Sequence, residues 1–153
     1  PGNIAGGITT LEEKSLGAIA KGGTRPIMGV IGIAEAPAGP GVHLMDAPGF
    51  SPESMTGFVA AGAQIVLFTT GAGNSYCSAI APTIKISARP DTIRHLATQI
   101  DYDASGVFEG REDLDAAADR LFALLLDVSS GTRTWGEVVG EAAESVIRVG
   151  GSL

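Results

Sequence analysis

A lysine inside an apolar run is the residue whose position most directly suggests chemistry. Lys85 lies between Ile84 and Ile86 in a segment typical of a β-strand, Thr83–Ser87. Burying an ammonium group is costly unless the group is paired or the strand face is wet. Such a lysine can hold a substrate carboxylate, or it can act as a base if burial lowers its pKa. The alternative is an edge-strand lysine that blocks sheet-to-sheet pairing.

A glycine-rich loop directly follows another apolar segment, Gln64–Thr70. Its candidate binding residues carry hydroxyl or amide groups or expose backbone N–H groups: Thr69, Thr70, Gly71, Gly73 and Asn74. Exposed N–H groups in such a loop can form a concavity that binds a carboxylate or phosphate. A tight turn contains the same residue types, so the loop by itself leaves both interpretations open.

Carboxylates occur at two positions where they could bind a metal ion or transfer a proton. Asp101 and Asp103 flank Tyr102. Hard metals take carboxylate ligands, although acids in a loop also form turns. Glu13 lies three residues after Thr10, which is the spacing of a capping box. Glu13 and the adjacent lysine therefore have a structural interpretation beside a catalytic one.

The remaining residue types exclude several common kinds of site. The chain has one cysteine and two histidines, far apart in sequence, which excludes a disulfide framework, a cysteine-rich zinc site and an HExxH pair. We interpret His43 as a core or surface histidine. Cys77 is interpreted as inert, because no basic residue beside it in the sequence lowers its pKa. Nucleophile-elbow and phosphate-loop motifs are absent.

The elements that must position these residues alternate along the chain. Strands are predicted at 27–33, 42–46, 64–70 and 83–87, and helices at 11–21, 52–61 (with Ser51 as its N-cap), 90–99, 114–128 and 135–147. Alternation of this kind predicts an α/β fold with a mostly parallel sheet and helices on its faces. Ligands of such sheets bind beyond the carboxyl ends of the strands. Attention therefore falls on Asp46, Thr69–Gly71 and Ser87.

Composition restricts the partners. The 153 residues carry a formal net charge of −7, which argues against a nucleic-acid or anionic-membrane surface. The longest apolar run, Leu121–Leu126, is far shorter than the ~18 residues that a membrane span needs. We expect a cytoplasmic protein without nucleic-acid or membrane partners.

Five segments form an ordered set over residues 1 to about 131: 1–3, 6–17, 67–73, 81–87 and 100–106. In order and spacing they resemble the C-terminal catalytic region of one family, the altronate and galactarate dehydratases. Gly-Gly-Ile-Thr-Thr-Leu-Glu-Glu-Lys is the most specific of these segments. The large subunit of sulfolactate sulfo-lyase belongs to the same family.

The resemblance implies a fold and a reaction. It implies a Rossmann-like three-layer sandwich, with residues 1–153 as a single α/β domain that forms part of a larger catalytic region. The reaction would be elimination of water from a sugar acid such as altronate or galactarate, to give a 2-keto-3-deoxy acid. Elimination of sulfite from sulfolactate is the alternative. A divalent metal, Fe²⁺ or alternatively Mn²⁺, would be required, and a homo-oligomer or an N-terminal partner segment or subunit is expected.

The resemblance and the residue types together select the site residues. Expected catalytic residues are Lys85, Glu13, Lys14 and Asp101. Substrate-binding residues would be Thr69, Thr70, Gly71, Gly73, Asn74 and Asn3, and metal ligands Glu13, Asp101 and Asp103. The family usually has an arginine where Ala72 stands and a Thr-Pro-aromatic-Gly stretch where residues 75–77, which end at Cys77, lie. The altered loop at Ala72 and Cys77 supports a competing hypothesis, a Rossmann-like domain that binds an anionic metabolite without catalysis.

Overall fold

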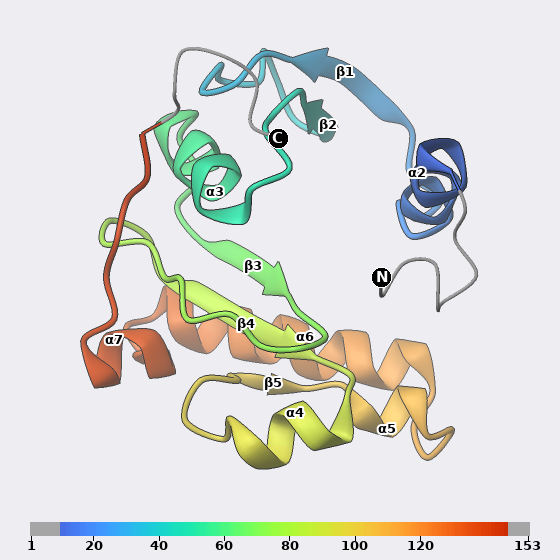
Figure 1. Ribbon diagram of the computed structural model, residues 1–153, viewed down its shortest axis with the longest axis vertical. Coiled ribbons are helices and arrows are strands. Elements are labelled where there is room, and N and C mark those ends of the chain that lie inside the picture. Colours follow the sequence, from blue (N-terminus) through green and yellow to red (C-terminus); the bar gives the residue numbers. More distant parts are fainter. Residues whose placement is uncertain (1–9, 147–153) are drawn as a thin grey trace.

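The structure, a computed structural model, describes residues 10–146 (Figure 1). Its helices are α2 (Leu11–Ala20), α3 (Ser51–Ala60), α4 (Pro90–His95), α5 (Ser105–Phe108), α6 (Leu114–Ser129) and α7 (Trp135–Val139). The strands are β1 (Ile27–Ile31), β2 (Val42–Met45), β3 (Val66–Thr69), β4 (Thr83–Ser87) and β5 (Tyr102–Asp103).

The described strands pair only in parallel, and they form two sheets. One sheet contains β1 and β2, and the other has the order β3-β4-β5. Helices flank these strands, so the predicted α/β fold with parallel strands is confirmed. Because β4 pairs on both sides, Lys85 lies in a central strand, and the edge-strand interpretation of this lysine is wrong.

The β3-β4-β5 sheet has a helix on each face (Figure 1). Met55 of α3 packs with Val66 of β3 on one face. On the other face, Ile84 and Ile86 of β4 pack with Tyr102 and with Leu121 and other apolar residues of α6. Side chains of a strand alternate between faces, so β4 directs its isoleucines toward α6 and the lysine between them toward the opposite face of the sheet.

Local signals explain where the helices begin. The side-chain oxygen of Thr10 accepts a hydrogen bond from the Glu13 N–H at 3.2 Å, and the Glu13 carboxylate accepts one from the Thr10 N–H at 3.2 Å. The predicted capping box is therefore confirmed. Asp113 caps α6 through the Ala116 N–H at 2.7 Å.

Two predicted helices are shorter than expected. The helix that opens at Pro90 ends at His95 rather than at residue 99, because Leu96 leaves the helical conformation and its side chain covers Gly73. The last helix ends at Val139, because Gly140 adopts a left-handed conformation with φ of 76°. Residues 141–146 then continue without helical or strand structure. The two-residue strand β5 and the single-turn helix α5 were not predicted.

Candidate functional site

A cavity of about 1320 Å³ lies at the carboxyl ends of β3, β4 and β5. Its polar edge is formed by Thr69, Thr70 and Gly71, which follow β3, and by Arg89, which follows β4. In Figure 1 the arrowheads of β3 and β4 point toward the side of the molecule where α2 and α5 lie. We call this space the carboxyl-edge cavity. It occupies the position at which parallel sheets generally bind ligands.

The rest of the carboxyl-edge cavity has apolar walls. Phe108 of α5 and Leu114 and Leu121 of α6 line it, together with Tyr102 of β5. A mostly apolar enclosure with a few convergent polar groups is the usual composition of a small-molecule site. The polar groups at one edge would therefore fix the orientation of a ligand.

Two cations border this cavity, and sequence reasoning missed both. The Arg89 side chain is 63% exposed, and its ion pair with Asp91 spans 4.0 Å. Asp91 also pairs with Arg94, and this second ion pair is the shorter of the two. The longer ion pair to Asp91 therefore leaves the Arg89 guanidinium accessible to an anion. Lys21, just after α2, is the second cation. Arg89 could have been found from the sequence, because it stands two residues beyond the predicted strand end at Ser87.

The glycine-rich loop divides into two parts. Thr69, Thr70 and Gly71 line the cavity, but Gly73 and Asn74 shape the loop instead. The Thr70 hydroxyl accepts a hydrogen bond from the Gly73 N–H at 3.0 Å, and Gly73 has φ of +93° beneath Leu96. The Asn74 side-chain oxygen accepts from the Tyr76 N–H at 2.9 Å. These contacts are those of a closed turn.

A second group of charges lies on the opposite face of the sheet. Lys85 is fully buried, and its Nζ lies 3.2 Å from the Glu141 carboxylate and donates to the Ser75 carbonyl at 3.1 Å. Asp101 accepts hydrogen bonds from the N–H groups of Lys85 at 2.8 Å and Trp135 at 2.7 Å. We call Lys85, Asp101, Glu141 and the neighbouring Cys77 the Lys85 cluster.

Burial dominates the titration of two members of this cluster. It raises the pKa of the Asp101 carboxyl, and hydrogen bonds from the two backbone N–H groups offset this effect only in part. Burial also raises the pKa of the Cys77 thiol, which the nearby Lys85 ammonium partly counteracts. A basic group therefore does lie beside Cys77, contrary to the sequence argument, but the thiol remains protonated at neutral pH because desolvation prevails.

The segment that follows α7 bonds to the Lys85 cluster and to the elements around it. Its Glu141 pairs with Lys85, and the Ala143 N–H donates to the Cys77 carbonyl at 2.9 Å. Glu144 accepts from Thr56 of α3 at 2.8 Å and also from Ser78. This segment, residues 140–146, thus joins α3 to the loop that precedes β4.

The structure does not bring the expected metal ligands together. Glu13 caps α2, Asp103 accepts from the Ser105 N–H at 2.8 Å, and Asp101 lies in the Lys85 cluster. Within residues 10–146 no three His, Cys, Asp or Glu side chains are placed to bind one metal ion. The described residues therefore do not fit the expected metal site. Asn3 and the Lys14 side chain lie outside what the structure describes.

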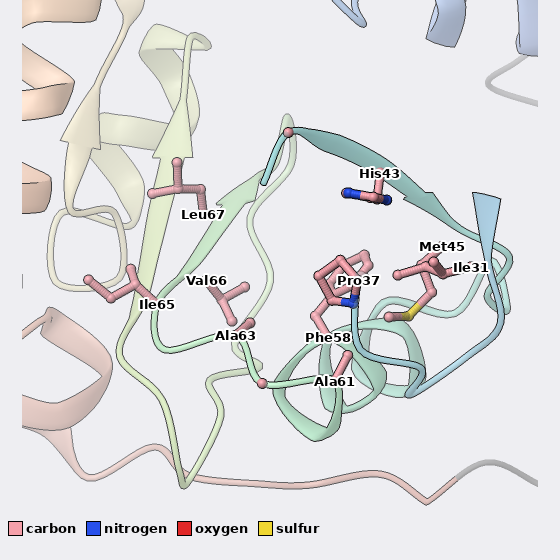
Figure 2. Close-up of a pocket in the computed structure, with 12 residues that line it drawn as sticks. Ile31, Pro37, His43, Met45, Phe58, Ala61, Ala63, Ile65, Val66 and Leu67 are labelled. Atoms are coloured by element: carbon pink, nitrogen blue, oxygen red, sulfur yellow. The ribbon is translucent and has the colours of Figure 1, made fainter. Parts of the chain in front are cut away.

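His43 lines a separate cavity of about 390 Å³ between the two sheets. Figure 2 shows this imidazole on β2, facing Leu67 of β3 and Phe58 of α3 across the space. Its Nε2 lies 3.1 Å from the Gly39 carbonyl, and its buried Nδ1 has no hydrogen-bond partner among the described residues. This cavity is reached at the amino end of β3, away from the glycine-rich loop.

The sequence matches the family described as D-galactarate/altronate dehydratase, C-terminal, over residues 1–152. The chain belongs to this family. It is 42% identical over 91% of its length to (2R)-sulfolactate sulfo-lyase subunit beta of Chromohalobacter salexigens. Its identity to altronate dehydratase of Escherichia coli is 34% over 90% of the chain, and to galactarate dehydratase (L-threo-forming) of the same organism 32% over 87%.

The match covers only part of each relative. The chain spans 36% of the length of the sulfo-lyase subunit, 27% of the altronate dehydratase and 25% of the galactarate dehydratase. The described helices include none that is long and apolar enough to cross a membrane.

Proposed function

We propose that this chain is part of a lyase that eliminates water from a sugar acid such as altronate or galactarate, to give a 2-keto-3-deoxy acid. Membership of the dehydratase family supports the reaction class. The observation that carries the proposal is the carboxyl-edge cavity, in which hydroxyl groups and accessible cations meet at the end of a parallel sheet. A sugar acid offers the matching groups, a carboxylate and several hydroxyls.

Four polar residues of the cavity have a part in this proposal. The Arg89 guanidinium binds the substrate carboxylate, because the one charged partner that it has among residues 10–146, Asp91, lies 4.0 Å away. The Lys21 ammonium adds positive charge at the same rim. Thr69 and Thr70 bond the substrate hydroxyls, and they place the C–H beside the carboxylate at a fixed distance from the sheet.

The other expected catalytic residues remain predictions. Lys85 could act on substrate only if Glu141 released its ammonium, since the two are paired and the lysine is fully buried. Asp101 is engaged by two backbone N–H groups. Glu13 and Lys14 belong to α2, whose C-cap residue Lys21 lines the cavity. Dependence on Fe²⁺ or Mn²⁺ also remains a prediction, for which ligands from outside the described residues would be needed.

One observation favours a second reaction. Identity is higher to the sulfolactate sulfo-lyase subunit, 42%, than to the altronate or galactarate dehydratases, 34% and 32%. Sulfite elimination from sulfolactate uses the same initial step, loss of a proton next to a carboxylate. The two reactions differ in the leaving group, so the same carboxylate-binding edge would serve either.

The experiment is an anaerobic assay of 2-keto acid formation with Fe²⁺, using altronate, galactarate and sulfolactate in parallel. It compares the 153-residue chain with the complete gene product that carries it. Turnover of a sugar acid supports the dehydratase, whereas sulfite release from sulfolactate selects the second reaction. Tight binding of an acid with no turnover in either preparation would favour the non-catalytic binding domain and overturn the proposal.

A further inference from the structure

The helix α2 carries apolar side chains that no other described element covers. Leu16 is 64% exposed and Ile19 is 72% exposed. They are three residues apart in a helix, so they lie on the same face. None of the extensive contacts between described helices and strands involves α2. A capped helix with an uncovered apolar stripe needs a surface on which to bury it.

The rim of the carboxyl-edge cavity carries a matching apolar surface. Phe108 of α5 is 74% exposed and Leu114, the first residue of α6, is 71% exposed. Both line the cavity. The apolar stripe of α2 and this rim are therefore two unpartnered surfaces of the same chemical character.

The chain geometry lets these surfaces meet. Lys21, the C-cap of α2, already lines the cavity. At a rise of 1.5 Å per residue, Ile19 and Leu16 lie only about 3 and 7.5 Å along the helix axis from Lys21. Gly22 and Gly23 follow, and Gly23 has φ of +77°. Glycine permits large changes of backbone angle, so this pair can serve as a hinge.

We propose that α2 is a lid that closes over the carboxyl-edge cavity by rotating about Gly22–Gly23, with Leu16 and Ile19 packing against Phe108 and Leu114. Closure covers the polar edge formed by Thr69–Gly71 and excludes water from it, which strengthens every electrostatic contact to a bound anion. The role of this closure in substrate binding rests on the proposed function. The movement itself depends only on the apolar surfaces and the hinge.

The test is disulfide trapping without any sugar acid present. In a Cys77→Ala background, Ile19→Cys is combined with Leu114→Cys, which leaves Leu16 and Phe108 as apolar partners. The matched control combines Ala18→Cys with Leu114→Cys, because Ala18 is exposed on a different side of α2. We expect the Ile19 pair to cross-link under mild oxidation at least tenfold faster than the control pair.

A second measurement keeps the test independent of the cysteine variants. Amide exchange of α2 in the Leu16→Asp/Ile19→Asp chain should be at least tenfold faster than in the Ala18→Asp chain. Equal cross-linking rates for the two pairs, no cross-link at all, or equal exchange in the two aspartate variants would each overturn the lid. Because no substrate is used, these outcomes leave the proposed lyase activity untouched, and failure to turn over sugar acids would leave the lid untouched. If Cys77→Ala prevents folding, the same pairs are made with Cys77 present and the disulfide is located by mass spectrometry.

Discussion

The Lys85 cluster and the carboxyl-edge cavity lie on opposite faces of one three-stranded sheet, and their charged groups differ in burial and in pairing. Lys85 is fully buried, with its ammonium bonded to Glu141 and Ser75. Arg89 is 63% exposed, with its partner carboxylate at 4.0 Å. A buried, satisfied charge stabilises one arrangement of the chain, whereas an exposed charge at the end of a strand is available to a ligand. The comparison predicts that the first region governs stability and the second governs binding.

The largest effect is expected from Lys85→Ala. This change removes a buried ammonium and leaves Glu141 and the Ser75 carbonyl without their partner, which should cost about 3 kcal/mol in the free energy of unfolding. Lys21→Ala, at the rim of the cavity, should cost less than about 0.5 kcal/mol. Urea denaturation of both variants measures the difference. Similar losses of stability in the two lysine variants would contradict the prediction that the Lys85 cluster governs stability.

Gly136→Ala tests how tightly the Lys85 cluster is packed. A Cβ at this position would collide with the Cys77 Sγ, and overpacking of this kind costs about 2 kcal/mol. The double variant Cys77→Ala/Gly136→Ala removes the sulfur that causes the collision. We expect thermal unfolding of the double variant to return most of the stability lost by Gly136→Ala. If the double variant is no more stable, the collision is not with Cys77.

Glu144→Gln tests the segment that closes the cluster. Burial alone would raise the pKa of Glu144, but hydrogen bonds from Ser78, Thr56 and other donors lower it below its ordinary value of 4.5. The carboxylate therefore contributes stability above pH 4.5, and this contribution is lost as the pH falls through the lower pKa of the folded state.

The Gln side chain places an NH₂ group, a hydrogen-bond donor, against the groups that donate to the Glu144 carboxylate. This mismatch should lower the free energy of unfolding by about 1–2 kcal/mol at neutral pH. Urea titrations above and below pH 4.5 should show that the loss shrinks in acid, where the wild-type carboxylate is itself protonated. A loss that is the same at every pH would contradict the role of the charge.

Arg89→Ala should have the smallest effect on stability, less than about 0.5 kcal/mol, because the side chain is exposed. Its effect on binding should be large. Loss of a charge-assisted hydrogen bond weakens binding of galactarate or sulfolactate by about tenfold or more, as measured by calorimetry. Arg133→Ala is the matched control, since Arg133 bonds the Glu137 carbonyl and does not line the cavity. Equal losses for the two arginines would indicate that the cavity is not the anion site.

The parts of the fold that depend on neighbouring residues were predictable. Thr10 and Glu13 identify a helix start, and the apolar runs around Val66 and Ile84 identify parallel strands. The site could be predicted only where it follows directly from strand ends, as at Thr69–Gly71. The partner of Lys85 could not be found, because Glu141 is 56 residues away and within a segment expected to be helical.

The same limit applies to Asp101. Its position in the sequence suggests a metal ligand or a group that transfers a proton. In the structure its carboxylate accepts hydrogen bonds from the backbone N–H groups of Lys85 and Trp135. Nothing local indicates that a residue 34 positions later will supply one of these donors. Short elements such as β5 fail for a related reason, since two residues contain too little periodicity to identify a strand.

The placement of residues 140–146 has a consequence for how the protein is made. The chain emerges from the ribosome with Lys85 long before Glu141, and the Glu144 that joins α3 to the loop before β4 comes later still. While the 56 residues from Lys85 to Glu141 are being added, the lysine of the central strand has been made but its carboxylate partner has not. The buried ion pair of the β3-β4-β5 sheet can therefore form only after Glu141 has been translated, and the bond that ties α3 to Glu144 can form only after that.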